Sequence, residues 1–299
     1  MNIQLHPTRE QIASWISAYV PEKDFFFMKE EDLSYFKNYL KETLVIPKDE
    51  FFNHASYRQV QLANSYEYWN ISMEIEIVIV AQSDWIYKLE PKEIEMLLLL
   101  QVEVGRGLIV PTELIFDLTI IPKEHIVKKD KKLHVVLQHD MWNKLPVTAK
   151  EQFIKSYALE WDSWNSIEVP AETPAHLKKY ANTFSTVSGA NCLAATLYAI
   201  STSPIKQEWI IHEWIHQQTF IKGIEHAGYV KKNDEFQDGD VVTWVNEAGI
   251  IQHASYYLGN NLLFNKNGQT FFNPWKIVHW DELKDEWKRY SVQSYRKMD

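Results

Sequence analysis

The chain has 299 residues, of which 45% are hydrophobic and 24% are charged, and its formal net charge at pH 7 is -9. This composition supports a sizeable core and excludes a disordered chain. Because nucleic-acid binding needs a basic face, the negative charge argues against a nucleic-acid partner.

The first half of the chain alternates helical and strand patterns. Apolar residues recur at helical spacing over residues 8–19, and Pro91 begins another helix at a favoured first-turn position. Alternation over residues 71–80 and a short apolar run at residues 133–137 predict strands. We therefore expect a mixed α/β N-terminal domain over residues 1–168, whose fold and role the sequence does not identify.

A proline-punctuated stretch, Val169–Pro174, follows a helical pattern and marks the expected domain boundary. Most of the nine glycines lie beyond it, from Gly189 onward. Helical patterns come first in this second part, and strands separated by turns follow, which predicts an α+β domain over residues 175–299. The expected elements are helices over 191–200 and after Ser203, and strands over 241–246, 250–258 and 262–265.

No apolar run is long enough to span a bilayer, and the N-terminal residues lack the basic and then apolar pattern of a secretory signal. We therefore expect a cytoplasmic protein without a membrane span. The sequence gives no indication of the oligomeric state.

Cys192 is the single cysteine, which excludes an internal disulfide framework and a multi-cysteine zinc site. It stands at the start of the predicted helix over residues 191–200, where the helix dipole and unpaired backbone amides stabilise a thiolate. The same amides can stabilise the oxyanion that forms when sulfur attacks a carbonyl. The alternative interpretation is a small apolar residue of the core.

His253 lies in the middle of the predicted strand over residues 250–258, and Asn265 lies in the strand after it. A base must reach the thiol in space, and a further polar side chain usually orients that base. We therefore predict a cofactor-free Cys192–His253–Asn265 triad that cleaves an amide or peptide bond. Passing the acyl group to an amine, as a transglutaminase or acyltransferase does, is an alternative with the same triad.

The order of these features resembles the NlpC-type cysteine peptidases, which are papain-like. The matching residues are the turn and strand Gly239–Val242, the stretch Tyr257–Asn260 after the histidine, and Trp280–Leu283 near the end. The resemblance implies a papain-like domain of helices packed on an antiparallel sheet, covering about the C-terminal half. It also implies that Tyr180, twelve positions before the cysteine (192 − 180), contributes to substrate binding.

The resemblance further implies a peptide substrate, such as a cell-wall peptide. The chain has Asn191–Ala194 (Asn-Cys-Leu-Ala) where the family usually has Asp-Cys-Ser-Gly. This difference supports another alternative, a catalytically inactive binding module on a peptidase scaffold.

The segment His212–His216 reads His-Glu-Trp-Ile-His and fits the H-E-x-x-H pattern of zinc metallopeptidases. On a helix, this spacing places His212 and His216 one turn apart with Glu213 as the base. The position that the metzincin pattern gives to a third ligand holds Lys222. The zinc site is therefore a rival hypothesis, and the segment is expected to be helical.

Overall fold

The computed structural model describes residues 1–298, whose elements mix helices with antiparallel sheets. Contacts divide the chain into two compact units. The N-terminal unit is Ile12–Tyr157, and the C-terminal unit joins Met1–Gln11 to the chain from Ala158 onward. No helix within residues 1–298 is both long and apolar enough to cross a membrane.

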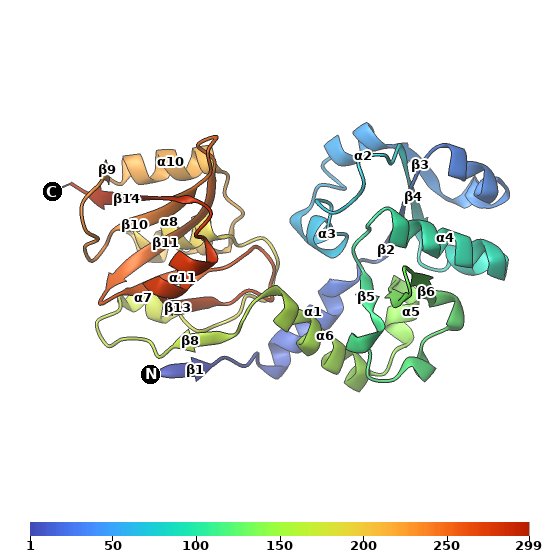
Figure 1. The fold of residues 1–299 in the computed structure, drawn as a ribbon, viewed down its shortest axis with the longest axis horizontal. Helices are drawn as coiled ribbons and strands as arrows, with labels where there is room; N and C mark the ends of the chain where they lie inside the picture. Colours follow the sequence, from blue (N-terminus) through green and yellow to red (C-terminus); the bar gives the residue numbers. More distant parts are fainter. Residues whose placement is uncertain (299) are drawn as a thin grey trace. The chain divides into compact units, whose positions relative to one another are not determined.

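The division between the units differs from the boundary expected at Val169–Pro174. Strand β1 (Asn2–Gln4) pairs antiparallel with β8 (Asn165–Ile167), as Figure 1 shows. The N-terminal strand and the stretch before Val169 therefore belong to the C-terminal unit. Only this pairing between distant segments assigns them, because no local pattern links the two ends of the chain.

The N-terminal unit contains two antiparallel three-stranded sheets, ordered β2-β4-β3 and β5-β7-β6. Its main elements, including the helices that cross into the other unit, are α1 (Arg9–Tyr19), β2 (Lys23–Met28), the 3-10 helix η1 (Glu31–Glu42), β3 (Leu44–Pro47), α2 (Lys48–Asn53), α3 (Val60–Ser65), β4 (Ile77–Gln82), α4 (Pro91–Glu103), β5 (Ile109–Pro111), β6 (Ile126–Lys129), β7 (Lys132–Val136), α5 (His139–Lys144) and α6 (Val147–Trp161). The helices expected over residues 8–19 and from Pro91, and the strand at 133–137, are therefore confirmed.

The strand expected over residues 71–80 is only partly correct, because β4 begins at Ile77. Ser72 closes a local turn before it. Its hydroxyl accepts a hydrogen bond from the Glu74 N–H at 3.2 Å, and its carbonyl accepts one from the Ile75 N–H at 3.4 Å. Serine side chains compete in this way with ladder hydrogen bonds.

The C-terminal unit is built on a six-stranded antiparallel sheet in the order β13-β12-β11-β10-β14-β9. Besides this sheet and the β1–β8 pair, the unit contains helices, which precede and follow the strands of the sheet along the chain (Figure 1). The elements are α7 (Ala175–Lys178), α8 (Cys192–Ala199), α9 (Pro204–Gln207), the 3-10 helix η6 (Glu208–His212), α10 (Gln217–His226), β9 (Tyr229–Lys232), β10 (Val241–Val245), β11 (Ile251–Gly259), β12 (Leu262–Lys266), β13 (Trp275–His279), α11 (Trp280–Glu286) and β14 (Ser291–Lys297).

Helices cover both faces of this sheet, and strand β10 is therefore buried throughout. Val241 packs in the cluster that contains Leu193 of α8 and Phe220 of α10. The next residue, Val242, packs in the cluster that contains Leu283 of α11. Since successive side chains of a strand point to opposite faces, α8 and α10 lie on one face and α11 on the other.

The turn between β11 and β12 sets how these strands pair. Gly259, Asn260 and Asn261 all have positive φ, and Gly259 pairs directly with Leu262. Glycine and asparagine tolerate this backbone, which the tightest hairpins require. A Cβ atom on Gly259 would lie 2.3 Å from a carboxylate oxygen of Asp238, so this exposed side chain would have to move, and the φ of +90° would strain other residues.

Candidate active site

Cys192 is the first residue of α8, and Asn191 caps this helix. The Asn191 Oδ1 atom accepts a hydrogen bond from the Ala194 N–H at 3.0 Å, and its Nδ2 atom donates to the Ile215 carbonyl at 2.8 Å. An asparagine cap of this kind satisfies one of the N–H groups that have no acceptor within the helix. The cap fixes the helix start at the cysteine, as the sequence predicts.

His253 is buried in β11, with 1% of its surface exposed. Its Nε2 atom lies 2.7 Å from Asn265 Oδ1, and the Ser255 hydroxyl donates to the same oxygen at 2.7 Å. Because a carboxamide oxygen only accepts hydrogen bonds, Nε2 carries the proton. The Nδ1 atom of His253 is then the nitrogen with a free lone pair, as a base requires.

The local sheet geometry explains why these side chains can meet. The ladder between β11 and β12 ends with the pair Tyr256–Phe264. Beyond that pair, side-chain hydrogen bonds of Ser255 and His253 to Asn265 join the strands. Ser255 was not among the predicted site residues, although its place two residues after His253 puts both side chains on the same face of the strand.

Trp287 holds the His253 ring from one side. The indole and imidazole rings are parallel within 5°, with centroids 4.5 Å apart. Trp244 lies 5.3 Å from the same ring at an angle of 50°. Nothing in the local sequence pattern pointed to Trp287, because it lies after α11 and reaches His253 only through the folding of the sheet.

Cys192 and His253 line one cavity of about 480 Å³, and Asn265 is bonded to His253. The structure thus places the predicted nucleophile and base on one cavity and joins the predicted orienting residue to the base. The backbone amides of Ala254 and Leu193 favour the thiolate form of Cys192. Within residues 1–298, no hydrogen bond joins the thiol to the imidazole. Hydrogen bonds between catalytic groups are often long before a substrate binds.

Burial keeps both members of the pair neutral. Desolvation raises the pKa of the Cys192 thiol to about 11, although hydrogen bonds from backbone amides, that of Ala254 first, oppose the shift. Desolvation lowers the pKa of His253 to about 4, against the hydrogen bond to Asn265. At neutral pH the two groups on this cavity are therefore a thiol and a neutral imidazole rather than a thiolate and an imidazolium.

Known proteins give no further guide to this site. No family model, no curated protein and no solved structure matches the chain. The relation to the NlpC-type peptidases therefore stays a prediction from the sequence.

Tyr180 does not lie at the cavity that Cys192 and His253 line. Its side chain is 7% exposed and belongs to a cluster with Trp275, whose ring centroid is 5.4 Å away. Its hydroxyl donates a hydrogen bond to the Glu208 carboxylate. Tyr180 is not among the residues that line the cavity of Cys192. Its predicted contact with substrate has no support from this placement.

The segment His212–His216 is not one helix, so the geometry assumed for zinc binding is wrong. The 3-10 helix η6 ends at His212, Glu213 is extended (φ −88°, ψ 156°), and His216 only caps α10. The extended stretch lets Ile215 pack against Phe220, so tertiary packing overrides the helical pattern. Among the described residues, no group of three or more His, Cys, Asp or Glu side chains could hold a metal ion.

The lowered pKa of His253 predicts acid sensitivity. The ordinary imidazole pKa is about 6.5, so an unfolded chain binds a proton that the folded chain resists until about pH 4. The neutral imidazole stabilises the fold above pH 6.5, and about 3 kcal/mol of that stability is lost as the pH falls to 4. Between pH 7 and 4, the free energy of unfolding measured in urea should fall less for His253→Gln than for the parent protein. Equal slopes for both proteins would contradict the burial of a neutral imidazole.

Proposed function

We propose that this protein is a thiol hydrolase of the papain-like, NlpC-type class that cleaves an amide or peptide bond. Cys192 is the nucleophile, His253 the base and Asn265 the residue that orients the base. One observation carries this proposal: the Nε2–H of His253 is held on Asn265 while the same imidazole lines a cavity with Cys192. An unprotonated Nδ1 atom next to a thiol is what nucleophilic catalysis by cysteine needs.

Because the resting pair is neutral, the proton moves as the sulfur attacks. The Cys192 thiol gives its proton to His253 Nδ1 while the sulfur forms a bond to the carbonyl carbon. The resulting oxyanion is stabilised by the backbone N–H of Cys192 at the start of α8. The imidazolium then protonates the leaving amine, the C–N bond breaks, and an acyl thioester remains on Cys192.

Water completes the reaction. His253 takes a proton from water as its oxygen attacks the thioester, the C–S bond breaks, and the thiol and a carboxylic acid are released. An amine in place of water would give acyl transfer by the same steps. Hydrolysis and acyl transfer therefore share the formation of the acyl-enzyme and differ only in whether water or an amine attacks it.

The test is the formation of the acyl-enzyme on Cys192. We expect 4-nitrophenyl acetate at pH 7.5 to release a burst of one nitrophenolate per protein, with one acetyl group found on Cys192 by mass spectrometry. Cys192→Ala, which lacks the only thiol of the chain, should show no burst. Adding ethanolamine then separates hydrolysis from acyl transfer, because only transfer yields an N-acyl product above the uncatalysed rate.

Acetylation of the parent protein no faster than that of Cys192→Ala would refute the proposal. That result would favour the catalytically inactive binding module.

A further inference from the structure

The wall of the cavity around Cys192 carries no fixed charge. Fifteen residues line it, and none of them is Asp, Glu, Lys or Arg. This is unexpected in a chain with 71 charged residues (31 + 40). A charged group that entered this cavity would lose water without gaining an oppositely charged partner, which is costly.

Lys266 does not line the cavity, and burial lowers its pKa to about 7, so at pH 8 its side chain is mostly a neutral amine. Its Nζ atom donates to the carbonyl oxygens of Thr270 at 3.1 Å and Asn273 at 2.5 Å. These bonds hold the amine at the loop that forms one wall, so it is not free to pair with an anion.

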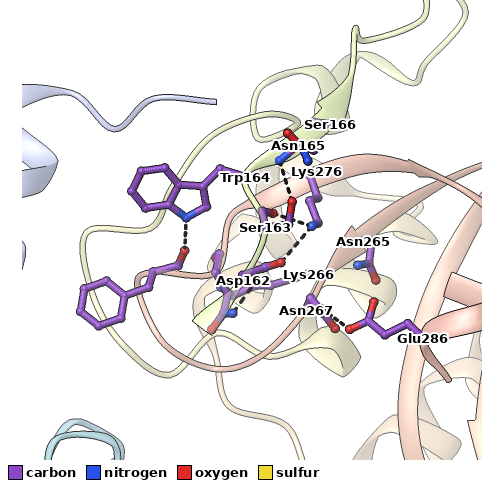
Figure 2. Close-up of polar contacts among 12 residues, drawn as sticks. Asp162, Ser163, Trp164, Asn165, Ser166, Asn265, Lys266, Asn267, Lys276 and Glu286 are labelled. Atoms are coloured by element: carbon purple, nitrogen blue, oxygen red, sulfur yellow. Dashed lines mark hydrogen bonds and ion pairs between the residues drawn. The ribbon is translucent and has the colours of Figure 1, made fainter. Parts of the chain in front are cut away.

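The start of helix α8 offers few amides to an anion bound elsewhere in the cavity. The Asn191 cap already accepts the Ala194 N–H, and the proposed reaction uses the Cys192 N–H for the oxyanion. On the opposite wall, Asn267 Nδ2 donates to the Glu286 carboxylate at 2.6 Å (Figure 2). A negative charge therefore stands behind this wall and repels anions.

Two side-chain oxygens of the wall are acceptors that receive no hydrogen bond from the described part of the protein. Within residues 1–298, no protein group donates a hydrogen bond to Gln252 Oε1 or Asn267 Oδ1. Both atoms suit the N–H groups of an amide. The rim is apolar, with Trp214 40% exposed and Ile250 50% exposed.

We propose that the acyl group accepted by this cavity is uncharged, with an apolar chain against Trp214 and Ile250, and that anionic acyl groups are rejected. This inference deepens the proposed function and rests on it, because only a hydrolase would transfer an acyl group to Cys192. It predicts N–H groups of the substrate on Gln252 and Asn267.

Matched esters test the proposal at pH 8, where an ordinary imidazole is neutral. The probes are 4-nitrophenyl hexanoate and 4-nitrophenyl hydrogen adipate, which have acyl chains of equal length and differ in that the adipate ends in a carboxylate, too distant to attack its own ester readily. The sulfur forms the thioester bond, the ester C–O bond breaks, and nitrophenolate leaves. After each rate is divided by the rate with free cysteine, we expect the hexanoate to acylate Cys192 at least about tenfold faster than the adipate.

A lysine on the wall should reverse the preference. Gln252→Lys is expected to raise the adipate rate at least about fivefold relative to the hexanoate rate, because the ammonium supplies the missing partner. The matched control is Thr202→Lys, which adds the same charge at an exposed position outside this cavity. The control should leave the ratio of the two rates as it is in the parent protein.

Alkylation separates failure of this inference from failure of the proposed function. Iodoacetamide and iodoacetate need only a reachable thiol, not catalysis. They again differ by one negative charge, because iodoacetate has a carboxylate where iodoacetamide has an amide. If neither ester acylates Cys192 but iodoacetamide still outpaces iodoacetate relative to free cysteine, the hydrolase fails and the uncharged wall stands. The proposal is overturned if the anionic reagent of either pair reacts as fast as the neutral one.

Discussion

Replacing His253 by glutamine should slow the acylation of Cys192 by about 10²- to 10⁴-fold, the usual contribution of a general base. The reason lies in the neutral resting pair. A thiol whose pKa is about 11 is almost entirely protonated at pH 7.5, so attack depends on a base that removes the proton. Glutamine can still reach Asn265 with a hydrogen bond, but it cannot accept that proton. Stopped-flow release of nitrophenolate from 4-nitrophenyl acetate measures the rate.

Other histidines provide the controls. His226→Gln changes an exposed imidazole outside the cavity and should leave the rate of the parent protein. His216→Gln should slow acylation far less than His253→Gln. His216 lines the cavity, but it contacts Trp214 edge to face, with ring centroids 4.2 Å apart, and does not bond to Asn265. Comparable losses for His216→Gln and His253→Gln would contradict the assignment of the base and reopen the role of the H-E-x-x-H segment.

Removing Lys276 should destabilise the C-terminal unit by about 3–5 kcal/mol, the usual cost of breaking a buried ion pair. Its Nζ atom lies 2.9 Å from Asp162 Oδ1 and donates to the Ser163 carbonyl at 2.8 Å, as Figure 2 shows. Both charged side chains are 2% exposed. Burial already raises the pKa of Asp162 despite the ion pair, so Lys276→Met leaves a carboxylate without water or a cation. Urea unfolding at pH 7.5 measures the loss.

Two comparisons make this result interpretable. Lys288→Met breaks an ion pair with Asp285, in which the side chains are 74% and 79% exposed, and should cost at most about 1 kcal/mol. The double variant Asp162→Leu with Lys276→Met removes both buried charges and should recover most of the stability. If Lys276→Met lowers the free energy of unfolding no more than Lys288→Met does, the prediction is wrong and the buried ion pair stabilises the fold no more than the exposed one.

Local patterns determined the elements of the candidate site. The helix start at Cys192 follows from the capping asparagine before it, and the strand around His253 follows from apolar residues between two turns. The turn at Gly259 requires glycine and asparagine, and this fixes the strand that carries Asn265. These features depend on residues that are close in sequence, so periodicity and turn chemistry could predict them.

Only the tertiary structure decided what surrounds those residues. Trp287 stacks on His253, and Ser255 shares the oxygen of Asn265, although no sequence signal had assigned either a role. The H-E-x-x-H segment is not one helix, because Ile215 packs into the core. Strand β1 belongs to the C-terminal unit, because it pairs with β8. Each of these outcomes depends on contacts between distant segments, whose energies outweigh local propensity. The sequence by itself thus determined which groups could react, and the fold decided that a half-buried thiol and a buried imidazole are both neutral and line a cavity with an uncharged wall.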